Sequence, residues 1–532
     1  MASAHGDGLP ETFETEPARY RHWRLSVSGR VARLALAVDE GGALADGVVL
    51  KRNSYDLGVD VELRDAVERL RFEHPQVACV LLESALPDVF CAGANIGMLA
   101  RSSHALKVNF CKLTNETRFA IEDASRAGQR YVAVLAGTAS GGGYELALAC
   151  ERIVLVDDRR AAVSLPELPL LAVLPGTGGL TRLVDKRRVR PDRADVFCTL
   201  EEGVRAPRAQ EWGLVDAIAR PSELDQVVER EVEAALAAAP AERAALEGER
   251  LEPLAPHSSD SELRYRFVNV RLEADRRCAT ITVQPPAALA DWLRFARELD
   301  DAVLRLRFHH PELGLWLVRS DGAAVDDSAL FGDGWLAAET RALYARVLKR
   351  VECSARSLFA IADSGSCFHG ALLELALACD RIYLLASGEN APVLRIGAAS
   401  RGAFPRANGL SRLEQRFYGD RAALERATAE RDPLDGEAAL ALGLATEAPD
   451  EVDWDDSLRV AIEERASFSP DALTGLEANL RFAGPETLET KVFARLSAWQ
   501  NWIFQRPNAA GPDGALAAYG RPERAKFDWK RV

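Results

Sequence analysis

Short apolar runs alternate with longer segments of mixed polarity through the first half of the chain. The runs 32–37, 77–82, 131–135 and 153–156 are four to six residues long, which is the length of buried strands. The segments between them are long enough for crossover helices. The pattern therefore predicts βαβ units and an α/β fold for residues 20–245.

The run 131–135 leads into a glycine-rich segment, Gly137-Thr-Ala-Ser-Gly-Gly-Gly-Tyr-Glu-Leu-Ala-Leu-Ala-Cys150. A strand, a glycine loop and a helix in this order point bare backbone N–H groups into a cavity, and the helix N-terminus adds partial positive charge. Glu145 lies at the start of the expected helix, and Glu167 follows between two prolines, in a segment that we expect to be irregular. Oxyanion donors and two carboxylates suit enolate chemistry.

The chain repeats part of itself. The segment 65–75 is echoed by 301–311, an offset of 236, and Glu-Leu-Ala-Leu-Ala-Cys at 145–150 returns at 374–379, an offset of 229. Gly-Leu-Thr-Arg-Leu from Gly179 returns as Gly-Leu-Ser-Arg-Leu from Gly409, an offset of 230. A period of this length indicates duplicated domains rather than a solenoid.

The second copy has lost the residues that carry the chemistry. By the same offsets, the three glycines 141–143 become Gly-Ala-Leu, and Gly397 stands in place of Glu167, so that Glu374 alone remains. We therefore expect a catalytic domain at 20–245, a linker near 240–260 and a degenerate copy at 262–450. Helical periodicity with Trp499 and Trp502 predicts a helical region at 451–532.

Composition narrows the class of protein. The chain has 532 residues and a formal net charge of −14, so it has no basic footprint for nucleic acid or an anionic membrane, and we expect neither as a partner. Nine scattered cysteines without a Cys-x-x-Cys pair indicate reduced thiols in a cytoplasmic protein. We expect no leader, no membrane span and no metal, and a loose tail over residues 1–16.

Three segments in the expected order resemble the signatures of the crotonase (enoyl-CoA hydratase/isomerase) superfamily. They are Phe-Cys-Ala-Gly-Ala-Asn-Ile at 90–96, the glycine-rich segment 137–150, and Pro-Glu-Leu at 166–168 with Leu-Pro-Gly-Thr-Gly-Gly-Leu-Thr-Arg-Leu at 174–183. The resemblance implies a crotonase-like ββα-superhelix, here duplicated with a degenerate second copy and followed by a C-terminal helical region. It also implies a coenzyme A thioester as substrate, a homo-oligomer with a dimer favoured, and no cofactor.

The resemblance carries over four catalytic positions. The backbone N–H groups of Ala94 and Gly142 correspond to the oxyanion hole, in which the thioester carbonyl would lie. Glu145 and Glu167 correspond to the two glutamates that hold a water and move protons. The alternatives from the residues alone are tight turns for the glycine clusters and a first-turn residue that satisfies the helix dipole for Glu145.

A narrower resemblance is to the benzoyl-CoA-dihydrodiol lyases. It rests on several segments spread over nearly the full length, namely 53–60, 109–118, 164–167, 473–482 and 498–504. It implies hydration and ring cleavage of 2,3-epoxybenzoyl-CoA to 3,4-dehydroadipyl-CoA semialdehyde and formate. If 107–118 is helical, Cys111 and Asn115 share one face that could line the acyl pocket. Lys51 and Ala92 are further candidates for substrate contacts.

Three other functions compete with this interpretation. A plain enoyl-CoA hydratase or isomerase would need the same oxyanion loops and glutamates, and a non-enzymatic acyl-CoA-binding scaffold would suit the second copy alone. The glycine pattern 137–143 also fits a dinucleotide-binding loop, but several strand-like segments precede it. No tyrosine in the chain has a lysine four residues later, so a nicotinamide cofactor is not expected.

Overall fold

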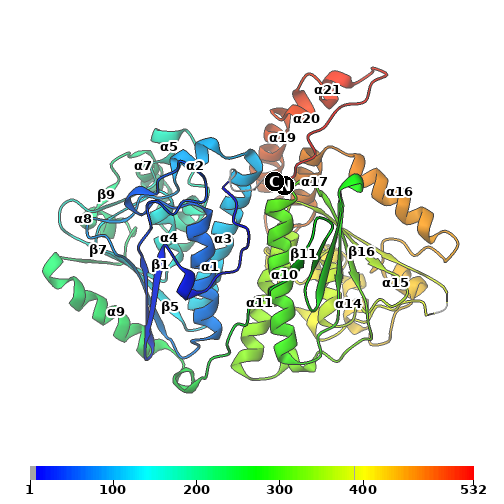
Figure 1. Ribbon diagram of the computed structural model, residues 1–532, viewed down its shortest axis with the longest axis horizontal. Coiled ribbons are helices and arrows are strands. Elements are labelled where there is room, and N and C mark those ends of the chain that lie inside the picture. Colours follow the sequence, from blue (N-terminus) through cyan, green and yellow to red (C-terminus); the bar gives the residue numbers. More distant parts are fainter. Residues whose placement is uncertain (1–7, 389) are drawn as a thin grey trace. The chain divides into compact units, whose positions relative to one another are not determined.

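The chain folds into two compact units. A computed structural model describes residues 8–388 and 390–532, and its two units are Met1–Pro253 and Leu254–Val532 (Figure 1). The helices beyond residue 450 belong to the second unit. The narrower domain limits expected from the sequence lie inside these units and stay a prediction.

A six-stranded sheet of order β1-β2-β3-β5-β7-β10 forms the centre of the first unit. β1 and β2 are antiparallel, and the other neighbours are parallel, as crossover helices require. Its strands are β1 Trp23–Ser28, β2 Val31–Leu36, β3 Cys79–Ser84, β5 Arg130–Leu135, β7 Arg152–Val156 and β10 Ala217–Ala219. A smaller sheet consists of β4 Val89–Cys91, β6 Thr138–Ser140, β8 Ala162–Ser164 and β9 Val204–Arg205.

The four predicted strands are confirmed as β2, β3, β5 and β7, each within two residues of the expected limits. The strand β6 was not predicted, because it lies inside the glycine-rich segment and is only three residues long. It pairs with β4 and β8, which are distant in the sequence, so no local periodicity marks it. This pairing joins the two glycine loops.

Helices cover both faces of the first sheet. Val227 and Val228 of α9 pack against one face, in a cluster with Leu81 and Val132, and α1 and α3 lie on the other (Figure 1). Asp56 caps α1 by accepting from the first-turn N–H groups. The helices are α1 Leu57–Phe72, α2 Ile96–Arg101, α3 His104–Arg126, α4 Gly142–Ala149, α5 Glu167–Leu171, α6 Gly179–Thr181, α7 Pro191–Thr199, α8 Ala206–Glu211 and α9 Leu224–Ala238.

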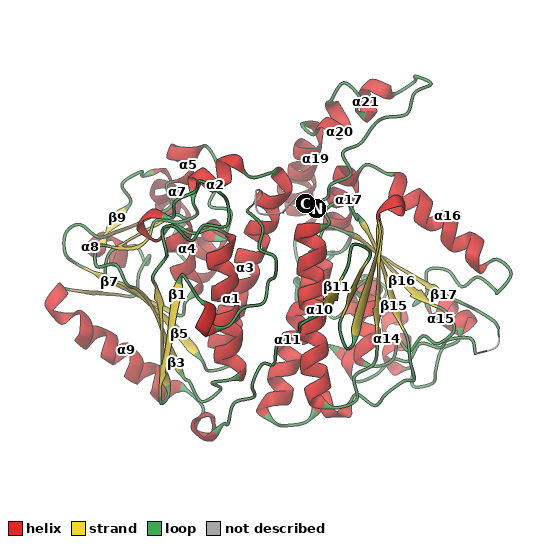
Figure 2. Cartoon of the chain, viewed as in Figure 1, coloured by secondary structure: helices red, strands yellow, loops and turns green. Residues whose placement is uncertain are grey.

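The second unit contains one seven-stranded sheet, in the order β11-β12-β13-β14-β15-β16-β17 (Figure 2). The first four strands pair antiparallel and the last four parallel. The strands are β11 His257–Ser258, β12 Glu262–Arg264, β13 Val268–Glu273, β14 Cys278–Val283, β15 Leu315–Ser320, β16 Ser357–Ala362 and β17 Arg381–Leu384.

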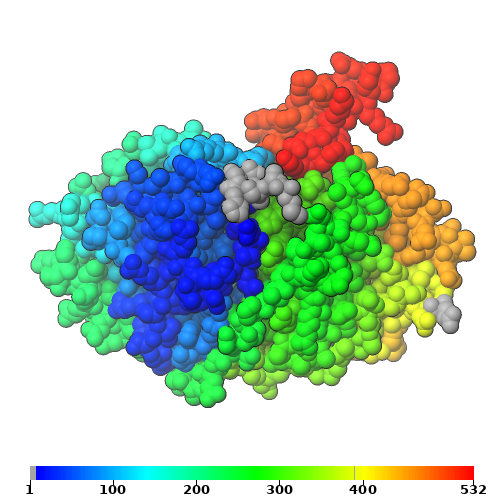
Figure 3. Space-filling view, viewed as in Figure 1, coloured from blue at the N-terminus to red at the C-terminus, as the bar shows by residue number. Residues whose placement is uncertain are grey.

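The helices of the second unit end in the predicted helical region. They are α10 Leu289–His309, α11 Trp335–Glu352, α12 Ala371–Leu377, α13 Arg412–Arg416, α14 Arg421–Ala429, α15 Gly436–Leu442, α16 Trp454–Ser467, α17 Pro470–Leu480, α18 Leu488–Thr490, α19 Ser497–Phe504, α20 Pro507–Ala510 and α21 Ala515–Ala518. The segment from α19 to α21, red in Figure 3, extends from the body of this unit with Leu516 and Tyr519 exposed.

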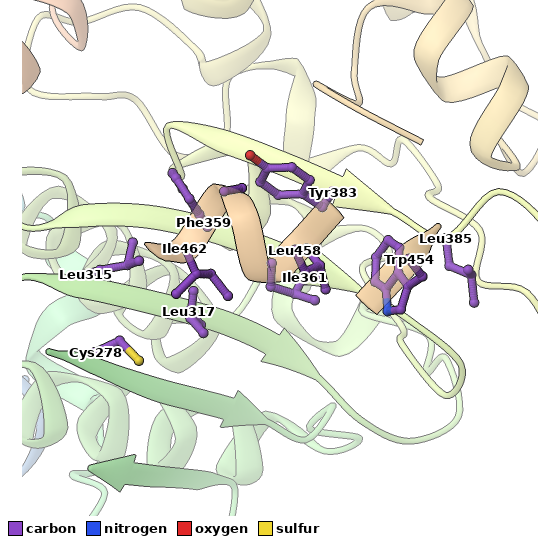
Figure 4. Packing of buried hydrophobic residues seen from close by; sticks show 11 residues of the cluster. Cys278, Leu315, Leu317, Phe359, Ile361, Tyr383, Leu385, Trp454, Leu458 and Ile462 are labelled. Atoms are coloured by element: carbon purple, nitrogen blue, oxygen red, sulfur yellow. The ribbon is translucent and has the colours of Figure 1, made fainter. Parts of the chain in front are cut away.

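The helix α16 lies across the second sheet as α9 lies across the first. Its side chains Trp454, Leu458 and Ile462 pack on strand residues that include Phe359 and Ile361 (Figure 4). The start of α16 follows the start of α9 by 454 − 224 = 230 residues, the same offset as the Gly-Leu-Thr-Arg-Leu repeat. The predicted duplication is therefore supported by helix position as well as by sequence.

Corresponding contacts recur in the two units, with an offset of 236 for the carboxylates and of 245 for their donors. Glu62 of α1 accepts from the N–H groups of residues 21–23, and Glu298 of α10 accepts from those of residues 266 and 267. Asp65 of α1 accepts from a tyrosine hydroxyl, as does Asp301 of α10. Corresponding buried carboxylates therefore hold corresponding strands against corresponding helices in the two units, which further supports a duplication.

The expectation of a loose N-terminal tail was wrong for the part that the structure describes; residues 1–7 lie outside it. Phe13 is fully buried, and Arg69 of α1 donates a hydrogen bond of 2.9 Å to the carbonyl oxygen of Thr15. An apolar anchor and a buried arginine therefore fix residues 13–15. One aromatic residue in a polar segment was the only sign of this in the sequence.

Candidate active site

The first glycine loop follows β4. Gly93 has φ of 88°, and a Cβ atom at this position would lie 2.9 Å from the Ser140 carbonyl oxygen and 3.0 Å from the Gly142 nitrogen. Only glycine fits so close to another backbone. Gly93 thus brings the first loop against the second, and Asn95 caps α2 with its side chain.

The second glycine loop ends β6 and starts α4. Gly141 has φ of 53° and is the N-cap of the helix. A side chain on Gly142 would collide with the Tyr55 hydroxyl, and one on Gly143 would collide with the carbonyl oxygen of Cys91. The three glycines are therefore required by close packing on both sides of the loop.

The N–H groups of Ala94 and Gly142 are available to a ligand. Gly142 is the first residue of α4, where an N–H has no acceptor within the helix. Across residues 8–388 and 390–532, neither of these two N–H groups donates to a protein acceptor. Two adjacent donors at a helix N-terminus suit a developing oxyanion.

Glu145 is held by a turn that comes from elsewhere in the chain. The residue is buried, and its Oε1 accepts from the Thr177 N–H at 3.0 Å and from the Gly179 N–H at 2.8 Å. The Thr177 hydroxyl donates to Oε2. Three donors therefore fix the carboxylate. Both donor residues, Thr177 and Gly179, belong to the segment 174–183 that resembles the second catalytic block.

Glu167 lies on the other side of the same loop. Its Oε1 would be 2.8 Å from a Cβ atom on Gly141, and its Oε2 is buried without a hydrogen-bond partner. Burial, together with the charge of Glu145, raises the pKa of Glu167 to about 7. A carboxyl group with this pKa exchanges protons readily near neutral pH.

The prediction of an irregular segment around Glu167 was wrong. Glu167 is the first residue of the short helix α5, with Pro166 as its N-cap. Pro169 is tolerated within this helix because N–H groups in the first turn have no acceptor within the helix. Two prolines in four residues conceal a helix of five residues from any search for periodicity.

A buried arginine connects these parts. Arg118 of α3 donates to the carbonyl oxygens of Gly142 at 2.8 Å and Thr177 at 2.7 Å and to the Tyr55 hydroxyl at 3.2 Å. Its Nη1 lies 3.9 Å from Oε2 of Glu145. Sequence reasoning did not single out Arg118, Tyr55 or Thr177. Helical spacing was an available signal, because Arg118 follows Cys111 by seven residues and shares its face.

The predicted pocket residues of α3 face the turn that holds Glu145. The Asn115 amide donates to the carbonyl oxygens of Cys111 at 3.1 Å and Gly176 at 3.2 Å, and its oxygen accepts from Arg182 at 3.4 Å. The Cys111 sulfur would lie 3.9 Å from a Cβ atom on Gly176. Burial raises the pKa of Cys111 to about 11, so the thiol stays protonated.

The other two candidates for substrate contacts lie at the surface beside the first loop. The Lys51 side chain is exposed, and Ala92 donates its N–H to the carbonyl oxygen of Arg52 at 3.2 Å. Arg52 and Asn53 have φ of 55° and 53°, and the buried Asn53 amide holds this turn through bonds to Leu36 and Phe90. A strained, well-anchored turn thus presents Lys51 to solvent.

No group of three or more histidine, cysteine, aspartate or glutamate residues in the described ranges is placed to hold a metal ion. Among the helices of those same ranges, none is long and apolar enough to cross a membrane.

Comparisons with known proteins give consistent matches. Residues 50–253 match the family described as enoyl-CoA hydratase/isomerase. The benzoyl-CoA-dihydrodiol lyase of Aromatoleum evansii is 50% identical over an alignment of 542 positions, which covers 98% of each chain. The fatty acid oxidation complex subunit alpha of Aliivibrio fischeri is 32% identical over 168 residues, 31% of this chain and 24% of that protein.

Solved structures cover about two fifths of this chain. An enoyl-CoA hydratase structure from Geobacillus kaustophilus HTA426 has 30% sequence identity and covers 41% of this chain and 75% of its own, with a TM-score of 0.36. A structure from Bacillus anthracis has 25% identity and covers 40% of this chain and 76% of its own, with a TM-score of 0.35.

Proposed function

The chain belongs to the crotonase superfamily and, within it, to the family of the Aromatoleum evansii benzoyl-CoA-dihydrodiol lyase, and we propose that it opens the ring of 2,3-epoxybenzoyl-CoA. The products would be 3,4-dehydroadipyl-CoA semialdehyde and formate. Atom balance requires two water molecules for each ring opened. The observation that carries the proposal is the 50% identity over 98% of both chains.

The thioester carbonyl would lie against the N–H groups of Ala94 and Gly142. As electron density moves onto the carbonyl oxygen, these two donors would stabilise it without reorganisation, because close packing fixes both loops. Loss of one such donor typically costs about 10²–10³ in rate. The oxyanion would act as the electron sink for proton transfer and for cleavage of the ring carbon–carbon bond.

The two glutamates would divide the proton transfers. Glu167, with its pKa raised to about 7 and one oxygen without a partner, is suited to take a proton from water and return it to carbon. Glu145 accepts three hydrogen bonds from Thr177 and Gly179, so it is suited to orient the attacking water.

The assembly and location follow as expectations of the same proposal. The nine cysteines are all free, which fits a reducing cytoplasm. Exposed apolar side chains of the C-terminal helices, such as Leu488 and Phe493, fit a covered surface in a homodimer. Light scattering of the purified protein would test the dimer, and a monomeric mass would contradict it.

The decisive test is turnover of synthetic 2,3-epoxybenzoyl-CoA. We expect formate and the C6 semialdehyde thioester in equal amounts, with two waters consumed. The double variant with Glu145→Gln and Glu167→Gln is the negative control, and crotonyl-CoA is the competing substrate. Efficient hydration of crotonyl-CoA without formate release from the epoxide would instead assign a plain enoyl-CoA hydratase.

A further inference from the structure

We propose that Arg118 is a positioning residue that couples the oxyanion loop to the acid–base pair. This inference rests on the proposed function and deepens it. A single buried guanidinium contacts the backbone of Gly142, the backbone of Thr177 and the hydroxyl of Tyr55. A shift of either loop would therefore be transmitted to the other through Arg118.

The hydrogen bonds of Arg118 reach three separate parts of the site. Through the Gly142 carbonyl it holds the residue whose N–H would bind the oxyanion. Through the Thr177 carbonyl it holds the turn that donates three hydrogen bonds to Glu145. Through the Tyr55 hydroxyl it fixes the ring that lies against Gly142. The planar fork of a guanidinium suits this combination, and an ammonium group has no equivalent geometry.

Arg118 is also a cation in a buried and otherwise acidic environment. Its side chain is 2% exposed and lies 3.9 Å from Glu145. Asp60 of α1 is buried nearby, and burial raises its pKa to about 6, while Arg118 lowers this pKa. The charge of Arg118 likewise lowers the pKa of Glu167. The guanidinium therefore offsets the mutual repulsion of the buried carboxylates.

The second unit has corresponding helices and loops but lacks the catalytic residues. Its contacts therefore show what holds these elements when no catalysis is required. At an offset of 230, Arg118 corresponds to Leu348 of α11, which is fully buried. Glu374, the counterpart of Glu145, is instead bonded directly to Arg412 at 3.1 Å. The carbonyl of Ala371, the counterpart of Gly142, accepts from the Tyr344 hydroxyl at 3.0 Å.

Corresponding arginines of the two units form different ion pairs. Arg412 pairs with both Glu352 at 2.8 Å and Glu374 at 3.1 Å, whereas its counterpart Arg182 pairs with Glu122 at 2.9 Å and leaves Glu145 to neutral donors. The second unit has a leucine at this helix position, and the neutral Tyr344 hydroxyl supplies the hydrogen bond to the loop carbonyl. Arg118 is therefore an addition to the catalytic unit, and it places a cation beside Glu145 without bonding to it.

The test compares Arg118→Lys, Arg118→Gln and Arg118→Leu, the last copying the residue of the second unit. We expect Arg118→Gln and Arg118→Leu to lower kcat about 10²-fold, as displacement of reacting groups does, with KM changed less than about threefold. Arg118→Lys keeps the charge and should recover part of kcat. Arg412→Gln is the control, since it removes a buried arginine of the second unit and should lower thermal stability with kcat unchanged.

The pH profile distinguishes positioning from general destabilisation. Glu145 of α4, Arg118 of α3 and Cys198 of α7 are the charged or titratable groups that interact with Glu167. Loss of the Arg118 charge should move the limb assigned to Glu167 to higher pH. Arg118→Lys should keep the wild-type limb.

Hydrogen exchange gives a readout that does not depend on turnover. In Arg118→Gln, the amides of Thr177 and Gly179 should exchange faster, while those of β5 should not change. Wild-type kcat, pH profile and amide exchange in Arg118→Gln and Arg118→Leu would overturn the proposal. If wild-type protein fails to open the epoxide, the proposed function falls, and amide exchange with benzoyl-CoA bound still decides the role of Arg118.

Discussion

Glu145 and Glu167 border the same glycine loop but are held in different ways. Glu145 accepts three hydrogen bonds and faces Arg118. Glu167 has one buried oxygen without a partner and a pKa raised to about 7. Two carboxyl groups in unlike environments are a usual basis for dividing acid and base roles.

Glu145→Gln and Glu167→Gln should each fold normally and lose about 10² or more in turnover, as expected for general acid–base groups. Binding of a CoA thioester should persist, because the backbone donors of Ala94 and Gly142 are unchanged. Steady-state kinetics and calorimetric titration with benzoyl-CoA would check both parts. A wild-type rate in either variant would remove that residue from the mechanism.

The raised pKa of Glu167 also predicts a pH-dependent stability difference. Above its ordinary value of 4.5 and up to about 7, the folded state binds more protons here than the unfolded state, so this contribution to stability is lost as pH rises through 7. Glu167→Gln should therefore gain about 1–2 kcal/mol over wild type at pH 8, after allowance for partial exposure. The gain should vanish near pH 4.5 in denaturant titrations, and an equal gain at both pH values would refute it.

At the scale of elements, α3 supports the turn that holds Glu145. Arg118 and Asn115 bind the carbonyl oxygens of Thr177 and Gly176 respectively, so one helix face fixes consecutive residues of the second catalytic block. The interpretation of Cys111 and Asn115 as pocket residues stays a prediction. The amide of Asn115 has protein partners on both its nitrogen and its oxygen.

Asn115→Ala should lower turnover of the epoxide while benzoyl-CoA binds about as well as to wild type. Loss of the amide removes its hydrogen bond to the exposed Gly176 carbonyl, at a net cost of about 0.5–1.5 kcal/mol. Cys111→Ala should do less, because a thiol is a weak donor. Parallel kinetics and binding measurements decide the matter, and epoxide kinetics equal to wild type for Asn115→Ala would show that this helix face has no part in specificity.

At the scale of the whole molecule, the second unit has closed the position that corresponds to the candidate site. The N–H of Ala371, the counterpart of Gly142, donates to Asp327 at 2.8 Å. The carboxylate therefore occupies the place where an oxyanion would lie in the first unit. Glu374 is in turn bonded to Arg412. The backbone donor and the glutamate of this unit therefore both have protein partners.

Glu374→Gln should accordingly affect stability more than rate. Its carboxylate is buried and pairs with Arg412, so neutralisation should lower the free energy of unfolding by about 1–3 kcal/mol. Turnover per folded molecule should stay within about twofold of wild type. Differential scanning calorimetry and kinetics on the same preparation would test this. A large fall in turnover with an unchanged melting temperature would show a second working site.

The sequence by itself determined the strands β2, β3, β5 and β7, the repeat, and the candidate residues Ala94, Gly142, Glu145 and Glu167. These signals are local, because periodicity reports burial and glycine reports close backbone approach. Tertiary structure alone decided that Thr177 holds Glu145, that Arg118 joins both loops, and that Asp327 caps Ala371. Each of these contacts joins residues more than 20 positions apart, so packing of distant elements, which no local pattern encodes, brings them together.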